Sequence, residues 1–198
     1  MSDAPQTFNL DLDVRTGWPA ELRVLLDRYP REAWPSHANL GMLAQFWLDR
    51  HDGFRAIGKA LDAGTVEFRS GVVAPQQFQA WFAPRLQFFL ANLHGHHQIE
   101  DLQYFPLFRA AEPRLVRGFE VLERDHEAIH DAIVGLADAA NALLRSKASD
   151  ADAMRTAGDR YAERGSAFLT GLLRHLDDEE DLIIPLILDR GEQELGVA

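Results

Sequence analysis

Cysteine is absent from the 198 residues of the chain. Without thiols the protein has no disulfide, no iron–sulfur cluster, no thiolate zinc site and no cysteine nucleophile. Any metal that the protein binds must therefore be held by nitrogen and oxygen atoms.

Positive charge and long hydrophobic runs are also scarce. Twenty Lys and Arg residues stand against 31 Asp and Glu, a formal net charge of −11, and no basic stripe is present to neutralise phosphates. No stretch reaches the about 18 uninterrupted apolar residues of a membrane-spanning helix, and no basic segment followed by an apolar one opens the sequence. We therefore expect a cytoplasmic protein with no nucleic-acid partner and no membrane.

The remaining composition is that of an ordinary globular domain, with 46% hydrophobic and 10% aromatic residues. Apolar residues recur at three- and four-residue steps over four long stretches, and no run alternates with period two. The pattern predicts no sheet and four long helices, over residues 36–63, 76–109, 112–144 and 151–189.

The predicted helices and loops divide the sequence into an N-terminal arm and a helical domain. Residues 1–35 lack a long helical period, apart from a short helix predicted over residues 19–29, and we interpret them as an arm packed on the domain. Gly64 is predicted to lie at the end of the first helix and Pro106 to terminate the second. Short loops between long helices predict an all-α, up-down-up-down four-helix bundle over residues 36–191, a fold whose core often holds metals.

An internal repeat relates the second predicted helix to the fourth. Each contains a histidine, a glutamate four residues later and a proline ten residues later. The two sets are His96, Glu100 and Pro106, and His175, Glu179 and Pro185. In a weaker match, His51 of the first helix aligns with His126 of the third. The chain is therefore interpreted as a duplicated helix pair.

The repeated residues predict a metal site. Residues four apart share one face of a helix, and this spacing joins His96 to Glu100, His126 to His130, and His175 to Glu179. Several carboxylates near a bundle core repel one another and lose hydration unless a cation compensates. The pattern predicts bound metal, and the number of carboxylates favours two ions. Imidazole and carboxylate ligands suit iron, manganese or zinc.

Two other metal sites were weighed. Residues 126–130 spell H-E-x-x-H, the zinc motif of metalloproteases. A protease site needs a third ligand downstream, and it leaves His51 and both His-x-x-x-Glu pairs unexplained. A ferritin-like site needs Glu-x-x-His on two helices, whereas Glu123–His126 and Glu127–His130 share one. We favour a third interpretation.

Residues 36–190 resemble the hemerythrin family, the HHE cation-binding domain. The resemblance is carried by a helical histidine followed by His-x-x-x-Glu that runs into an aromatic residue and proline, repeated in the second half. It implies one iron held by His126, His130 and His175, a second iron held by His51 and His96, and Glu100, Glu179 and an oxo or hydroxo group as bridges. The second iron, with fewer histidines, would keep a position open for O₂ or another small ligand.

The chain departs from the family pattern at two positions. Oxygen-carrying hemerythrins have an aspartate five residues after the last histidine, where this chain has Glu180. The internal repeat favours Glu179 as the ligand and leaves Glu180 as the alternative. Many relatives lack the histidine at the position of His130.

The resemblance implies a non-haem di-iron protein that binds O₂ or senses oxygen, redox state or nitric oxide, rather than an enzyme. One alternative is a di-iron oxidoreductase acting on peroxide or nitric oxide, which an acid such as His97 or Tyr104 facing the pocket would favour. Another is an iron-responsive regulatory module whose fold depends on metal. His94 and His97 lie off the His96 face and are predicted outside the ligand set.

Overall fold

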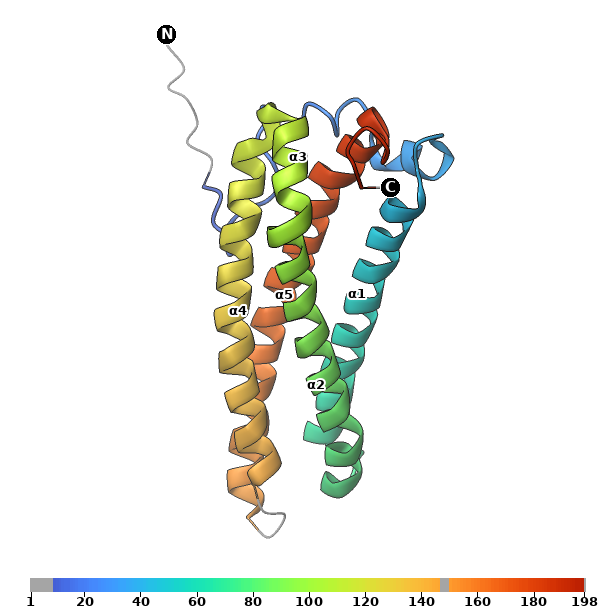
Figure 1. Ribbon diagram of the computed structural model, residues 1–198. Helices are drawn as coiled ribbons and strands as arrows, with labels where there is room; N and C mark the ends of the chain where they lie inside the picture. The colour runs from blue at the N-terminus through green and yellow to red at the C-terminus, as the bar shows by residue number, and fades with distance from the viewer. Residues whose placement is uncertain (1–8, 147–149, 198) are drawn as a thin grey trace. The chain divides into compact units, whose positions relative to one another are not determined.

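The computed structural model describes residues 9–146 and 150–197, which form helices and turns without a strand. The elements are the 3-10 turn η1 (Arg31–Ser36), α1 (Met42–Arg69), α2 (Pro75–Ile99), the π-helical turn η2 (Glu100–Tyr104), α3 (Phe105–Ala111), the 3-10 turn η3 (Pro113–Leu115), α4 (Val116–Arg145) and α5 (Ala151–Arg190) (Figure 1). The predicted all-α helical bundle is confirmed. None of the described helices is both long and apolar enough to cross a membrane.

The chain is divided into two compact units. Unit 1 comprises residues 1–47, 101–125 and 174–198, and unit 2 comprises residues 48–100 and 126–173. Unit 2 takes one segment from each of α1, α2, α4 and α5, and consecutive segments run antiparallel (Figure 1). Their aromatic rings meet in its core, where Phe82 packs edge-on to Tyr161 with ring centroids 4.9 Å apart.

The first long helix extends further than its sequence predicts. α1 passes through Gly64 and ends at Arg69. The predicted end was wrong because Gly64 makes room for a neighbour: a Cβ at this position would lie 2.5 Å from Cζ3 of Trp81. Gly71 follows the helix with φ +76°, a left-handed conformation that glycine adopts without strain, and the chain turns there.

The second predicted helix is divided. α2 ends at Ile99, the π-helical turn η2 follows, and α3 begins at Phe105. Pro106 therefore lies in the first turn of a helix, where its missing N–H has no intrahelical partner to lose. The prediction that Pro106 terminates a helix was wrong for this reason.

Unit 1 contains the described part of the predicted arm, whose first eight residues lie outside the described residues. The short helix predicted over residues 19–29 is a series of turns instead. Its backbone hydrogen bonds mix three- and four-residue steps, such as Leu22 N–H to Pro19 and Tyr29 N–H to Leu25. Pro30 disfavours helical backbone at Tyr29, where this series of turns ends.

Candidate metal site

Three predicted ligands converge in unit 2. The Nε2 atoms of His51 and His96 lie 3.0 Å apart, and Nε2 of His96 lies 2.9 Å from Oε1 of Glu100. Ligand atoms of all three residues lie within 4.8 Å of one another. His51 and Glu100 are buried, with 0% and 1% of their surfaces exposed. The four-residue spacing thus places His96, near the end of α2, and Glu100, at the start of η2, on one side of the helical segment, close to His51 of α1.

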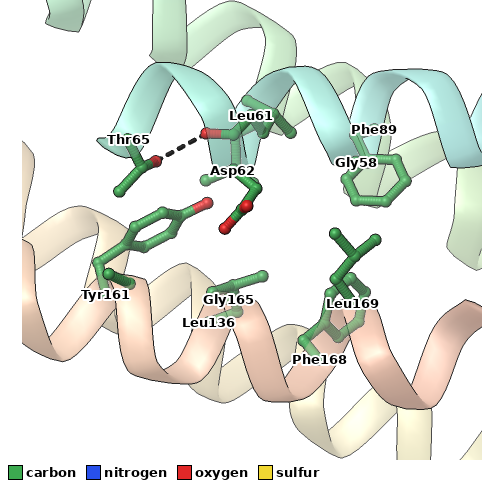
Figure 2. Close-up of a pocket in the computed structure, with 12 residues that line it drawn as sticks. Gly58, Leu61, Asp62, Thr65, Phe89, Leu136, Tyr161, Gly165, Phe168 and Leu169 are labelled. Carbon is green, nitrogen blue, oxygen red and sulfur yellow. Dashed lines mark hydrogen bonds between the residues drawn. The ribbon is translucent and has the colours of Figure 1, made fainter. Parts of the chain in front are cut away.

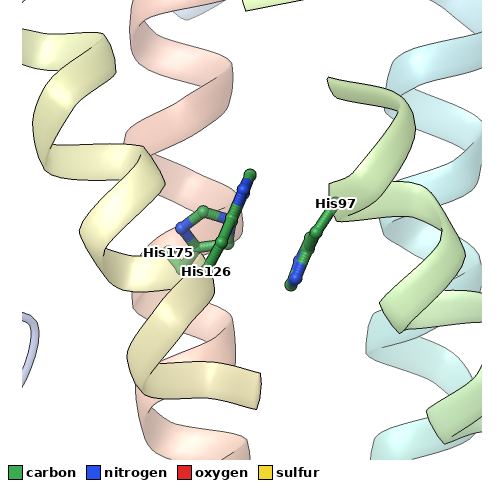
Figure 3. Close-up of side chains that lie close together, drawn as sticks. All are labelled: His97, His126 and His175. Carbon is green, nitrogen blue, oxygen red and sulfur yellow. The ribbon is translucent and has the colours of Figure 1, made fainter. Parts of the chain in front are cut away.

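Two further imidazoles extend this cluster. Nε2 of His126 lies 3.7 Å from Oε2 of Glu100. The ring of His97 stacks on that of His126, with centroids 4.0 Å apart and an interplanar angle of 6° (Figure 3). Both are buried. Sequence reasoning placed His97 outside the ligand set, although its three-residue spacing to Glu100 also puts two residues on one helix face.

The backbone changes at the centre of the cluster. The N–H of Glu100 donates to the carbonyls of both His96 and His97, and the chain passes there from α-helix to π-helix. π-Helical turns are rare and frequently lie at functional sites. Glu100 is thus held by the backbone of the same turn that carries the two histidines.

The donor set fits a metal ion. Neutral imidazole nitrogens and ionised carboxylate oxygens are ligands of iron, manganese and zinc. A buried carboxylate is costly unless positive charge compensates it. The approach of His51, His96 and His126 to the Glu100 carboxylate provides donors of the required kinds, already gathered within one unit.

Unit 1 contains the second histidine–glutamate pair. Nε2 of His175 lies 3.1 Å from Oε2 of Glu179, and its Nδ1 lies 3.4 Å from Oδ2 of Asp125. The indole N–H of Trp47 donates to Oε1 of Glu179 at 2.6 Å. Burial alone would lower the pKa of His175, but the hydrogen bonds and charges of Asp125 and Glu179 outweigh it and raise the pKa to about 9.

An arginine of the arm supports this pair. Nη2 of Arg15 lies 2.5 Å from Oδ2 of Asp125, and its Nε lies 2.7 Å from Oδ2 of Asp178. Burial raises the pKa of Asp125, whereas His175 and Arg15 together lower it below its ordinary value. Asp125 is therefore an ionised acceptor for the Nδ1–H of His175, an arrangement that orients metal-binding histidines through their other nitrogen.

The two adjacent glutamates of α5 have different partners. Glu179 contacts His175 and Trp47, whereas Oε2 of Glu180 lies 2.9 Å from Nη1 of Arg31. Arg31 also pairs with Asp181 at 2.7 Å. Glu180 is thus engaged by the arm.

The remaining predicted ligand, His130, lies elsewhere in unit 2. Its side chain is exposed, and its ring centroid lies 5.0 Å from that of His94. Both histidines line a groove between α2 and α4, together with apolar residues such as Leu90 and Ile133. His130 therefore lies beside His94. The role of His130 as a metal ligand stays a prediction. Tyr104 lies in unit 1, edge-on to Trp47.

Comparison with known proteins gives one family. The profile described as Hemerythrin HHE cation binding domain matches residues 42–187. No curated protein and no solved structure gives a significant match. The matched segment includes all of unit 2 and the part of α5 that carries His175 and Glu179.

Proposed function

The chain belongs to the hemerythrin HHE cation-binding domain family, and on this premise we propose that it is a non-haem di-iron protein that binds O₂ or senses oxygen, redox state or nitric oxide. The convergence of His51, His96 and Glu100 in unit 2 carries the proposal. A buried group of nitrogen and oxygen donors without sulfur supports iron.

The proposed ligands come from both copies of the repeat. They are His51, His96, Glu100, His126, His175 and Glu179, with His130 as the seventh residue predicted from the sequence. Support for Glu179 rather than Glu180 comes from their partners, since Glu180 pairs with Arg31. His97 is a further candidate because it is buried against His126.

Iron held by these residues would supply a ferrous–ferric couple and an affinity for O₂ and nitric oxide. The chain itself contributes position and protection from water. Asp125 holds the proton on Nδ1 of His175, so that Nε2 faces Glu179. The Trp47 N–H fixes one oxygen of Glu179. Burial of His51 and Glu100 keeps bulk water from the donors.

Metal content and optical spectra of the purified full chain test the proposal. The protein is reduced without air and then exposed to O₂. We expect two irons per chain and visible absorption bands that appear with O₂ and disappear when O₂ is removed. Two irons that oxidise without such bands would favour a sensor or, if peroxide or nitric oxide is consumed, an oxidoreductase. One zinc and no iron would overturn the di-iron proposal.

A further inference from the structure

Unit 2 contains a small cavity away from the metal ligands. It has a volume of about 20 Å³ and lies among α1, α2, α4 and α5 (Figure 2). This is enough for one molecule about the size of water. Its apolar wall is formed by Leu61, Leu86, Phe89, Leu136, Phe168 and Leu169. Among the α1 residues that line the cavity, Gly58 is the nearest in sequence to His51. The two are seven residues apart, or about 10 Å along the helix.

Polar groups lie at one end of the cavity. The hydroxyl of Thr65 donates a hydrogen bond within α1, to the carbonyl of Leu61 at 2.7 Å (Figure 2). Burial, with a smaller effect of the Asp62 charge, raises the pKa of Tyr161, so its phenol stays uncharged. Asp62 is the exposed member of the lining and marks the side on which the cavity opens. A carboxylate at the opening disfavours anions, and the apolar wall disfavours an unpaired ion of either sign.

A row of aromatic rings joins the cavity wall to the metal site. Phe89 of the wall lies 6.0 Å from Phe168 and 6.2 Å from Phe54, measured between ring centroids. Phe54 in turn lies 5.1 Å from the ring of His96. Phe54 and Phe89 are both buried. Packed aromatic side chains therefore connect the cavity wall to a predicted iron ligand.

We propose that this cavity is a docking site for an uncharged diatomic molecule, O₂ or nitric oxide, at the far end of the aromatic row that reaches His96. The choice of this ligand class rests on the proposed function. Two properties select it: the volume admits one very small molecule, and the wall is mostly apolar. Apolar cavities take apolar guests in preference to water.

Two glycines of α5 provide a matched pair of variants. In Gly165→Ala, the new methyl would lie 3.8 Å from the Tyr161 ring and 3.9 Å from Cδ1 of Leu136, so it occupies the cavity without a clash. In Gly158→Ala, the methyl would lie 3.5 Å from Phe68 and outside this cavity. Both substitutions replace a helical glycine with alanine and gain the same helix propensity.

The test is NMR relaxation of methyl protons in the full chain, prepared metal-free and with zinc, under nitrogen and under pressurised O₂. Dissolved O₂ is paramagnetic, so it relaxes the methyls beside which it resides. We expect strong O₂-dependent relaxation at Leu61, Leu136 and Leu169 in the wild type and in Gly158→Ala. In Gly165→Ala this relaxation should be lost.

Relaxation of these methyls no stronger than at the exposed Val134 would overturn the proposal. So would unchanged relaxation in Gly165→Ala, or a persistent water detected by its cross-peak to Tyr161. The wild-type pattern answers the question even if a variant does not fold. Because neither preparation contains iron, the result is independent of the metal content and oxygen spectra that test the proposed function.

Discussion

The two copies of the His-x-x-x-Glu motif have the same spacing and different surroundings. In the first copy, His96 and Glu100 face other imidazoles, with Nε2 of His51 3.0 Å from Nε2 of His96. In the second copy, His175 contacts the Asp125 carboxylate and Glu179 contacts the Trp47 indole, both within unit 1. Within unit 2 the first motif is accompanied by further histidines, whereas within unit 1 the second motif is accompanied by a network of ion pairs.

The backbone around the two copies differs as well. The first copy lies where α2 gives way to the π-helical turn, and the proline ten residues after its histidine starts α3. The second lies within α5, which continues through Pro185. The comparison teaches that the repeat determines which donors are presented, whereas neighbouring segments determine their charge and rigidity.

The largest expected effect distinguishes the two glutamates. We expect Glu100→Gln to lower iron affinity by more than about 10- to 100-fold, the range caused by mutating residues that support a ligand. Glu179→Gln should lose less, because the Trp47 N–H that donates at 2.6 Å can still hold the amide oxygen. Iron content after loading and desalting measures both. Glu127→Gln, at an exposed residue of α4, is the control; wild-type iron content in Glu100→Gln would contradict its role.

The ion-pair network of the second copy is tested at the arm. Arg15→Met removes the buried guanidinium shared by Asp125 and Asp178, which should lower the free energy of unfolding by about 3 to 5 kcal/mol. Arg31→Met is the matched control, since Arg31 also bridges two acidic residues of α5. Its side chain is 41% exposed against 0% for Arg15, so we expect at most about 1 kcal/mol. Urea unfolding followed by circular dichroism measures the free energy of unfolding of both variants. Equal decreases would show that the burial of Arg15 is unimportant.

A smaller effect concerns the composition of the histidine-rich cluster. His97 is buried against His126, whereas His130 is exposed beside His94. We expect His97→Ala to lower iron affinity by about 10- to 100-fold, the range for residues that hold or orient ligands, and His130→Ala to lower it less. Competition with a chelator measures both. A greater loss in His130→Ala would support the ligand role that the sequence predicts for it.

The smallest effect is a pH dependence in unit 1. Arg114 donates two hydrogen bonds of 2.7 Å to Glu112 and lowers the pKa of that carboxyl from 4.5 to about 2. Because the folded pKa is depressed, this stabilisation is present above pH 4.5 and is lost as the pH falls towards 2. We expect about 1 kcal/mol, since solvent screens the exposed Arg114. Urea midpoints between neutral and acidic pH should fall less steeply in Glu112→Gln; an identical slope would contradict the prediction.

Local periodicity accounts for what the sequence predicted well. Three- and four-residue steps of apolar residues identified the all-α fold, and the four-residue step predicted that His96 and Glu100 share a face. The π-helical turn was missed because its residues fit an α-helical pattern equally well. The end of α1 was missed because the role of Gly64 depends on Trp81, which lies on another helix.

The partners of Arg15 had no local signal at all. Asp125 and Asp178 lie 110 and 163 residues away in the sequence, and nothing near Arg15 marks it as a buried residue. Likewise, the stacking of His97 on His126 depends on the packing of two helices rather than on a motif. Contacts between distant segments determine these details of the candidate site.

The 163 residues between Arg15 and Asp178 also have a consequence for how the chain folds. The arm leaves the ribosome long before Asp178, one of its two buried partners, is made. Closing so long a loop carries an entropic cost before the contact is formed, and such contacts form late and slow folding. The N-terminal arm therefore cannot complete its ion pairs until residue 178 has been made, and its docking comes late in folding.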